Sequence, residues 1–345
     1  MHDRLFTDEL RAFQTAVRRF VQAEIVPHYA RWEDAGVVDR AVFAKAGALG
    51  ILCPGQADAF GGAGLDFSYS AVVAEELSRA FVSGVFFTLH SDIVAPYIEH
   101  HGSDEQRRRW LPGMAAGTTI GAIAMTEPGA GSDLQAMRTT AVLDDDGSHF
   151  VLNGTKTFIS NATLCDLCIV AARTETDGSA SRQISLIVVE KGTPGFAVGQ
   201  PFDKLGLHAQ DTAELSFTDC RVPVGNLLGH RGRGLQALMQ ELARERLVVA
   251  VGCVASARAA LELTTSYVKD RQVFGKPLAQ QQNTRFTIAE MAMQVNVAEA
   301  FVDRCIEELA GGTLTTETAS MAKWHSSEML GRVVDDGLQL FGGYG

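Results

Sequence analysis

Residues 139–160 read TTAVLDDDGSHFVLNGTKTFIS and decide the fold class of this chain of 345 residues. Three short β-prone runs within them, at 139–143, 149–153 and 157–160, favour strands. The acidic stretch 144–148, which contains a glycine, favours a hairpin turn between the first two runs. The middle of the chain is therefore expected to form a compact β domain.

The β-prone texture extends over residues 120–231, and helical patterns lie on both sides of it. From Leu10 to Ile25 apolar residues recur every three or four positions, which is the spacing of one buried helix face, and Thr7 stands where it can cap that helix. Long helical patterns return after residue 232. Further strands are expected at 120–125, 167–173, 184–189, 196–198 and 214–222, and long helices at 235–270, 280–310 and 315–341.

These zones predict an α+β protein that is mainly helical. We expect an N-terminal helical domain over 1–119, a central β domain over 120–231 and a C-terminal helical bundle over 232–345. Near the end of the N-terminal domain, Ser103 is expected to open a short helix that Pro112 and Gly113 close.

Composition excludes several classes of protein. Apolar residues make up 46% of the chain, which suits a globular protein, and a net charge of −11 argues against nucleic-acid binding. The start of the chain has no apolar stretch typical of a signal peptide, and the longest apolar run, 247–257, is too short to span a bilayer. We therefore expect a cytoplasmic protein without membrane insertion.

Six cysteines include one closely spaced pair, Cys165 and Cys168. No second pair or nearby histidine completes a zinc site, and residues three apart in a strand point to opposite faces. We expect no metal site there, only reduced and buried thiols.

Two segments contain residues that are suited to chemistry. In MTEPGAGSD, residues 125–133, glycines and Ser132 would let backbone N–H groups approach an anion, although the segment also fits a simple turn. Glu245 lies on the flank of an apolar stripe that includes Met239 and Val249, and Arg246 lies inside that stripe. Partial burial would raise the pKa of the Glu245 carboxyl and suit it to act as a general base. On composition alone, a structural ion pair is the stronger interpretation of these two charges.

Two more segments follow near the chain's end. Arg271, with Phe274 close behind it, would hold a phosphate and cover a ring, or would simply end a helix. Residues 339–345, QLFGGYG, are typical of a helix C-cap and are weak evidence of a site.

Five segments together resemble the acyl-CoA dehydrogenase family, in the family's order and over essentially the whole chain. They are 124–133, 153–161 (NGTKTFISN), 206–212 (GLHAQDT), 271–276 and 339–345. The resemblance implies an N-terminal helical domain, a central β-barrel-like domain and a C-terminal four-helix bundle, of which this chain contains an incomplete part.

The resemblance also implies an activity. Members of the family bind FAD and oxidise an acyl-CoA thioester to its 2,3-enoyl form, passing electrons to an electron-transferring flavoprotein. A carboxylate removes the α-proton, while the β-hydrogen leaves as hydride to flavin N5. A homodimer or homotetramer is expected.

By the same resemblance, two groups of residues would contact FAD. Within one subunit, Met125 and Thr126 would meet the flavin ring edge, Gly131 and Ser132 the pyrophosphate or, for Ser132, the substrate, and Phe158 and Ser160 the ring face and the N5 side. Across a dimer interface, Arg271, Phe274 and Gln282 would contact the partner's FAD, with Gln339 and Gly343 at its adenosine half.

Members of the family carry the catalytic base in one of two sequence contexts. Most members carry it in a Tyr-Glu-Gly-Thr motif beyond the paired glycines, past residue 345. The long-chain and isovaleryl branches carry it in a Glu-Arg-Leu context, which residues 244–247 (RERL) repeat. The resemblance thus makes Glu245 the base and places Arg246 beside it to tune the carboxylate or to order the substrate pocket.

The segment beyond residue 345 also supplies, in the family, a backbone N–H to the substrate carbonyl. We therefore expect either a fragment of a longer protein or an impaired form. The alternatives to a dehydrogenase are an acyl-CoA oxidase-like flavoprotein that uses oxygen and a non-catalytic subunit that binds acyl-CoA or flavin.

Overall fold

The structure is a computed structural model that describes residues 7–174 and 183–345. It consists of two compact units, each formed from separate stretches of the chain. The first unit contains residues 7–23, 66–82 and 243–345, and the second contains the described residues of 24–65 and 83–242.

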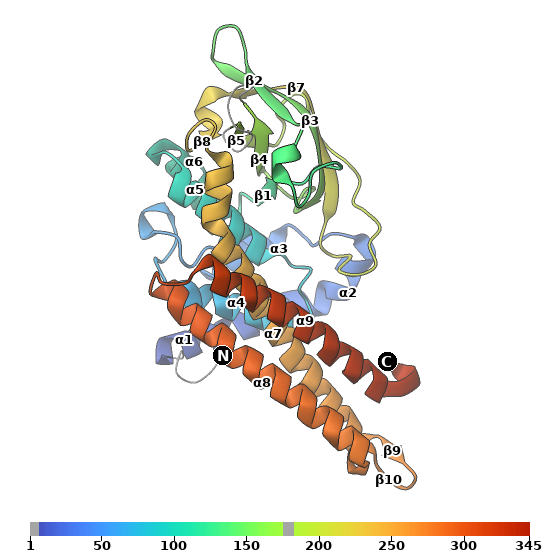
Figure 1. The fold of residues 1–345 in the computed structure, drawn as a ribbon. Coiled ribbons are helices and arrows are strands. Elements are labelled where there is room, and N and C mark those ends of the chain that lie inside the picture. The colour runs from blue at the N-terminus through green and yellow to red at the C-terminus, as the bar shows by residue number, and fades with distance from the viewer. Residues whose placement is uncertain (1–6, 175–182) are drawn as a thin grey trace. The chain divides into compact units, whose positions relative to one another are not determined.

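The first unit is helical. Three long helices of the C-terminal region form most of it (Figure 1). Leu247, Met291 and Val333, one from each of these helices, are fully buried in its core. The helices are α1 (Asp8–Phe20), α4 (Phe67–Arg79), α7 (Gly234–Asp270, which begins in the second unit), α8 (Gln282–Ala310) and α9 (Thr316–Phe341).

Polar contacts fix the ends and pairing of these helices. The Thr7 hydroxyl accepts a hydrogen bond from Leu10 N at 3.2 Å and caps α1, as predicted. Arg18 of α1 forms a bidentate ion pair with Glu76 of α4, whose side chain is only 4% exposed.

The second unit combines helices with the β domain. Its longer helices are α2 (Val26–Ala35), α3 (Ala41–Gly47), α5 (Ala95–His101) and α6 (Asp104–Ala115). Its shorter helices are η2 (Asp58–Phe60), η3 (Leu89–Val94), η4 (Leu134–Ala136), η6 (Val224–Asn226) and the last two residues of η1 (Val21–Ile25).

Helix α6 begins where the sequence predicted and ends later. Ser103 and Gln106 form a reciprocal capping box at its start. Pro112 was expected to close the helix but lies inside it, because a proline lacks only its own N–H and its carbonyl still accepts from Ala116 N at 3.0 Å.

The strands form one eight-stranded sheet in the order β6-β7-β3-β2-β4-β5-β8, with β1 parallel to β4 (Figure 1). The strands are β1 (Gly121–Ala124), β2 (Thr140–Leu143), β3 (His149–Ser160), β4 (Leu167–Arg173), β5 (Ile184–Glu190), β6 (Phe196–Val198), β7 (Thr212–Pro223) and β8 (Leu227–Leu228). The predicted order of helical, β and helical regions is confirmed.

The two strands expected at 149–153 and 157–160 are one continuous strand, β3. Gly154 allows this continuity, since its φ is +149° and a Cβ there would lie 2.5 Å from Thr139 Oγ1. The glycine was taken from the sequence as a break, whereas it permits close approach of two chain segments.

Among the described residues, one helix, α7, is long and apolar enough to cross a membrane. Its most apolar window has a mean hydropathy of 1.7, and 56% of that window is buried within the protein. One helix of this kind is weak evidence for a membrane span, because core helices of soluble proteins share these properties.

His90 connects the helical part of the second unit to β1. Its Nδ1 accepts a hydrogen bond from Gly121 N at 3.1 Å, and its Nε2 lies 3.0 Å from Met114 O, to which it donates in the neutral form. The ring is fully buried, and this burial lowers the pKa of His90 to about 4. The imidazole is therefore neutral at pH 7 and holds the first residue of β1.

This buried histidine predicts loss of stability in acid. The unfolded chain binds a proton at His90 near pH 6.5 and the folded chain only near pH 4, so the free energy of unfolding falls as the pH drops through this window. His90 should contribute on the order of 3 kcal/mol to that fall. In urea titrations, His90→Gln should be less stable than the wild type at pH 7, and the difference should shrink toward pH 4. If the free energies of unfolding of the two proteins kept a constant difference between pH 7 and pH 4, His90 would not be the group responsible.

Candidate active site

In the second unit, the segment after β1 lies beside the end of β3. Thr157 N donates to Thr126 O at 2.9 Å, and Lys156 Nζ donates to Met125 O at 3.0 Å. Both Met125 and Thr126 remain half-buried. The structure thus brings the predicted ring-edge residues next to residues 157–158.

A buried ion pair holds this arrangement. Lys156 is 0% exposed and its Nζ lies 2.8 Å from Glu127 Oε1. The Glu127 carboxylate also accepts from Arg138 N at 2.6 Å and Thr139 N at 3.0 Å. Burial raises the pKa of Glu127, but the hydrogen bonds from Lys156 and Thr139 outweigh it and leave the pKa below its usual value.

The glycine segment forms a tight turn. Glu127 and Ala130 exchange two backbone hydrogen bonds of 2.9 and 3.1 Å. Gly131 and Ser132 are exposed, and a Cβ built on Gly131 would meet nothing within 4 Å. The turn interpretation of the sequence is therefore right, and the turn leaves Gly131 and Ser132 open to a ligand.

Phe158 has the geometry of a residue held for function. Its φ is +58°, which is unfavourable for an aromatic residue, and its side chain is 67% exposed. A shift in register between Lys156 and Ile159 turns the strand at this point, and the ring packs 5.3 Å from that of Phe202. The half-buried Ser160 follows, with its Oγ accepting a hydrogen bond from Gln210 Nε2 at 2.6 Å.

In the first unit, Glu245 and Arg246 are both half-buried on α7, next to the fully buried Leu247. Arg246 Nη1 is buried, and no described residue accepts a hydrogen bond from it. Buried donors normally have a partner, so this atom is suited to a ligand acceptor. The expected apolar stripe is only partly right, because Met239 and Val249 are exposed.

Arg271 lies where α7 ends and a small hairpin begins. The hairpin consists of β9 (Gln272–Val273) and β10 (Lys276–Pro277), and Phe274 at its turn is 97% exposed. The short helix η7 (Leu278–Gln280) leads to Gln282, the exposed first residue of α8.

The last residues of the chain lie near Arg271, whose guanidinium is 5.9 Å from the centre of the Tyr344 ring. Helix α9 ends at Phe341 with Gly342 at φ +64°, as the helix-cap interpretation predicts, and η8 (Gly342–Tyr344) follows. Gln339 and Gly343 are exposed. Beside them an apolar groove of about 730 Å³ runs between α7 and α9, lined by Ala260, Thr264, Leu330, Val334, Leu338 and Tyr344.

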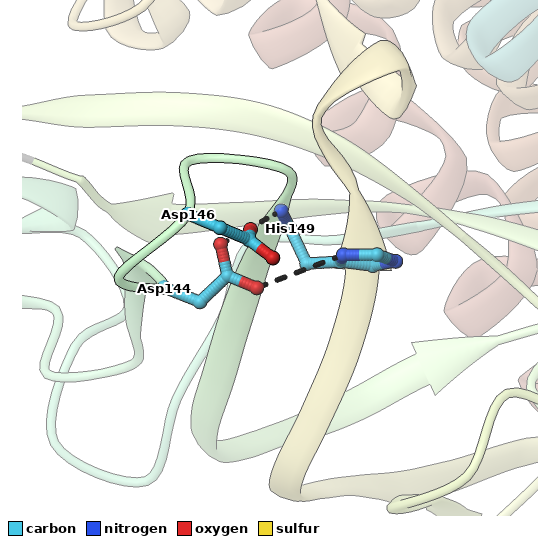
Figure 2. A group of neighbouring side chains, drawn as sticks. All are labelled: Asp144, Asp146 and His149. Atoms are coloured by element: carbon cyan, nitrogen blue, oxygen red, sulfur yellow. Dashed lines mark hydrogen bonds and ion pairs between the residues drawn. The ribbon is translucent and has the colours of Figure 1, made fainter.

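Figure 2 shows one group with the composition of a metal site, namely Asp144, Asp146 and His149 in the β2–β3 hairpin. Backbone N–H groups of residues 148 and 149 donate to its carboxylates, and Arg221 binds Asp144 Oδ2 at 2.6 Å. The carboxylates therefore close the hairpin and pair with an arginine, which gives them a structural role.

The closely spaced cysteines Cys165 and Cys168 are free thiols, and both are buried, as predicted. Burial raises the pKa of Cys165 to about 12 and that of Cys168 well above its usual value. These thiols are unsuited to redox or metal chemistry at neutral pH.

Known proteins resemble this chain over nearly its whole length. Three family models match it in succession, namely the acyl-CoA dehydrogenase N-terminal domain over residues 7–118, the middle domain over 122–220 and the C-terminal domain over 232–345. The chain belongs to the acyl-CoA dehydrogenase family. The resemblance predicted from five motifs is confirmed.

Among relatives within this acyl-CoA dehydrogenase family, the mitochondrial long-chain specific enzyme of Sus scrofa is 46% identical over 99% of this chain and 79% of its own length. The isovaleryl-CoA dehydrogenase of Pongo abelii is 34% identical over 98% of this chain and 81% of its own. The crystal structure of an acyl-CoA dehydrogenase from Geobacillus kaustophilus has a TM-score of 0.96 and 46% identity, covering 98% of this chain and 89% of that one.

Two features of the chain were not predicted from its sequence. Lys156 and Glu127 were quoted in motifs, but their pairing across 29 residues was not expected. Gln210 was likewise quoted without a role. Lys156 continues the alternation of the apolar residues Phe150 and Leu152 along this strand, which is the one sequence signal that points to a buried lysine with a partner.

Removing the buried cation tests the ion pair. Lys156→Met should lower the free energy of unfolding by about 3–5 kcal/mol, because it leaves the Glu127 carboxylate buried without its counter-charge. The double variant Lys156→Met/Glu127→Gln should recover part of this loss. Lys191→Met, at an exposed lysine of the same unit, is the control and should change stability by less than about 0.5 kcal/mol. A similar small effect of Lys156→Met in denaturant titrations would show that the pair does not hold the turn.

Proposed function

We propose that this protein is a FAD-dependent acyl-CoA dehydrogenase that converts an acyl-CoA thioester to the 2,3-enoyl-CoA, with Glu245 as the base that removes the α-proton. Its family makes it an oxidoreductase that acts on acyl-CoA. The single observation that carries the assignment of the base is the half-buried pair Glu245–Arg246 on α7, in the sequence context RERL.

The second unit fits FAD by the chemistry of its side chains. Exposed Phe158 offers an apolar face, and the hydroxyls of Thr126 and Ser160 offer hydrogen bonds, as a flat ring with polar edges requires. The open turn at Gly131 and Ser132 suits a pyrophosphate. Two similar structures support the cofactor: an acyl-CoA dehydrogenase of Bacillus anthracis solved with FAD and a glutaryl-CoA dehydrogenase of Mycobacterium smegmatis solved with FADH2, each 31% identical to this chain.

The proposed residues take different parts in the reaction. FAD, when bound, accepts the β-hydrogen as hydride. Glu245 takes the α-proton, whose loss places negative charge on the thioester oxygen. Arg246 has a buried Nη1 donor that an acceptor on the substrate would satisfy, and a donor fixed before the reaction stabilises charge more effectively than water does. Ser132 and Arg246 are thus our proposed substrate contacts.

A second copy of the chain completes the proposed site. Arg271, Phe274, Gln282, Gln339 and Gly343 are exposed at one end of the first unit, where we propose that they hold the FAD of a partner subunit. An electron-transferring flavoprotein is the proposed electron acceptor. A chain in a solved structure of the electron-transferring flavoprotein of Acidaminococcus fermentans is 34% identical to this one. The predicted cytoplasmic location stays a prediction.

Replacement of the base tests the central assignment. Glu245→Gln should purify yellow with bound FAD, and acyl-CoA should reduce its flavin more slowly by a factor of about 10²–10⁴, because general-base catalysis contributes that much. The measurement is the bleaching of the flavin absorbance without oxygen, with acyl-CoAs of graded chain length.

Glu290→Gln, which removes an exposed carboxylate on α8, is the matched control and should bleach at the wild-type rate. Near-normal bleaching of Glu245→Gln would remove Glu245 as the base. Formation of hydrogen peroxide by the wild type without an added acceptor would favour the oxidase-like alternative over a dehydrogenase.

The proposed contact between Arg246 and the substrate can be tested separately from Glu245. Arg246→Leu should weaken the binding of acyl-CoA by about tenfold or more, the value of one charge-assisted hydrogen bond. The free energy of unfolding should change by no more than about 1 kcal/mol, because the variant removes a buried donor that no described residue satisfies. Calorimetric titration and thermal unfolding measure the two effects. A large loss of stability with unchanged affinity would show a purely structural arginine.

A further inference from the structure

The loop of residues 204–211 carries a side chain that controls one of the proposed flavin contacts. Gln210 Nε2 donates to Ser160 Oγ at 2.6 Å, across 50 residues of sequence. A hydroxyl has one hydrogen and two lone pairs. Since the amide occupies a lone pair, the hydrogen of Ser160 stays available for a second partner that accepts.

Two carboxylates fix the backbone on both sides of Gln210. On one side, the Glu33 carboxylate of α2 accepts from His208 N at 3.0 Å and Ala209 N at 3.1 Å. On the other side, Asp211 Oδ2 accepts from Thr163 N at 2.7 Å and Leu164 N at 3.2 Å. The hydrogen bonds of these two carboxylates therefore hold the backbone in place before and after residue 210. We call this pair of contacts the clamp.

Further contacts tighten the same loop. Lys204 Nζ binds the carbonyl oxygen of Gln210, and Gln210 N donates to Leu207 O at 3.1 Å. Leu207 is held at φ +52°, a strained value for a leucine. Strain of this kind persists only where the surroundings over-determine the backbone, and it concentrates at functional sites.

The target of the loop is equally constrained. Ser160 lies between Phe158 and Asn161, which both have φ of +58°. Asn161 Nδ2 donates to Gly121 O at 3.3 Å and so ties the end of β3 to β1. The backbone around Ser160 cannot adjust freely, and the rotation of its hydroxyl is set by its hydrogen-bond partner.

We propose that Gln210 is a positioning residue, which occupies a lone pair of Ser160 and directs the Ser160 hydrogen toward the flavin, while the Glu33 and Asp211 carboxylates hold Gln210 in place. This inference rests on the proposed function, since it needs a flavin next to Ser160. It assigns a role to an amide that touches neither cofactor nor substrate.

The test is a double-mutant cycle on the FAD-loaded protein. Gln210→Leu should shift the flavin absorption band and slow anaerobic reduction by acyl-CoA by roughly tenfold, the effect of one lost hydrogen bond. Gln210→Glu should slow it further, because a carboxylate accepts the Ser160 hydrogen and turns it away from the flavin. In a Ser160→Ala background, Gln210→Leu should have no additional effect on the rate or on the spectrum.

The controls separate positioning from folding. Gln22→Leu, at an exposed glutamine of η1, should leave spectrum and rate unchanged. Glu33→Gln, which weakens the clamp, should shift the band in the same direction as Gln210→Leu but less. The affinity of the Gln210 and Glu33 variants for FAD, measured by flavin fluorescence, should stay within about threefold of the wild type, because neither residue is a proposed flavin contact.

The outcomes distinguish this inference from the proposed function. A wild-type spectrum and rate for Gln210→Leu, or equal losses with and without Ser160, would overturn the inference and leave the dehydrogenase proposal standing. A wild-type protein that binds no FAD would overturn both.

Discussion

The second unit depends on one desolvated ion pair. Lys156 is fully enclosed, and a buried ammonium is tolerated only with a counter-charge and hydrogen-bond acceptors around it. Glu127 and the carbonyl of Met125 supply them. Because Glu127 also receives two backbone N–H groups from residues 138 and 139, the pair joins three separate segments of chain. The glycine turn, the end of β3 and the start of β2 therefore hold one another in place.

Around this pair, the protein stabilises several unfavourable backbone conformations. Phe158, Asn161 and Leu207 each adopt a positive φ, which costs on the order of 1 kcal/mol or more per residue. Hydrogen bonds from separate elements offset that cost, including those of Glu33 and Asp211. An apolar ring and a hydroxyl are thereby fixed before any ligand arrives. Prior order of this kind reduces the entropy that binding must overcome.

Features that depend on residues close together in the chain were predicted from the sequence. Features that depend on contacts between distant residues were not. The helices expected at 235–270 and 315–341 were observed within one residue of those bounds, because periodicity over many turns is a local and redundant signal. From the sequence, Pro112 was expected to end a helix and Gly154 to separate two strands. Neither does so, because the residues packed around each of them determine the local structure. The role proposed for Phe158 came from a family resemblance, and the same resemblance was needed to prefer a catalytic base over a structural ion pair at Glu245. The bond from Gln210 to Ser160 spans 50 residues, and no pattern in the sequence predicts it.

All six cysteines are free, and five of them are buried while Cys253 is partly so. Burial raises the pKa of Cys220 and Cys305 to about 11, and that of Cys253 is raised for the same reason. Only the thiolate reacts readily with electrophiles, and burial also keeps reagents away, so the native thiols should react slowly at neutral pH. A cysteine introduced at an exposed position would then accept a maleimide dye selectively, and pairs of such dyes would report the separation of the two units in solution without a cysteine-free background.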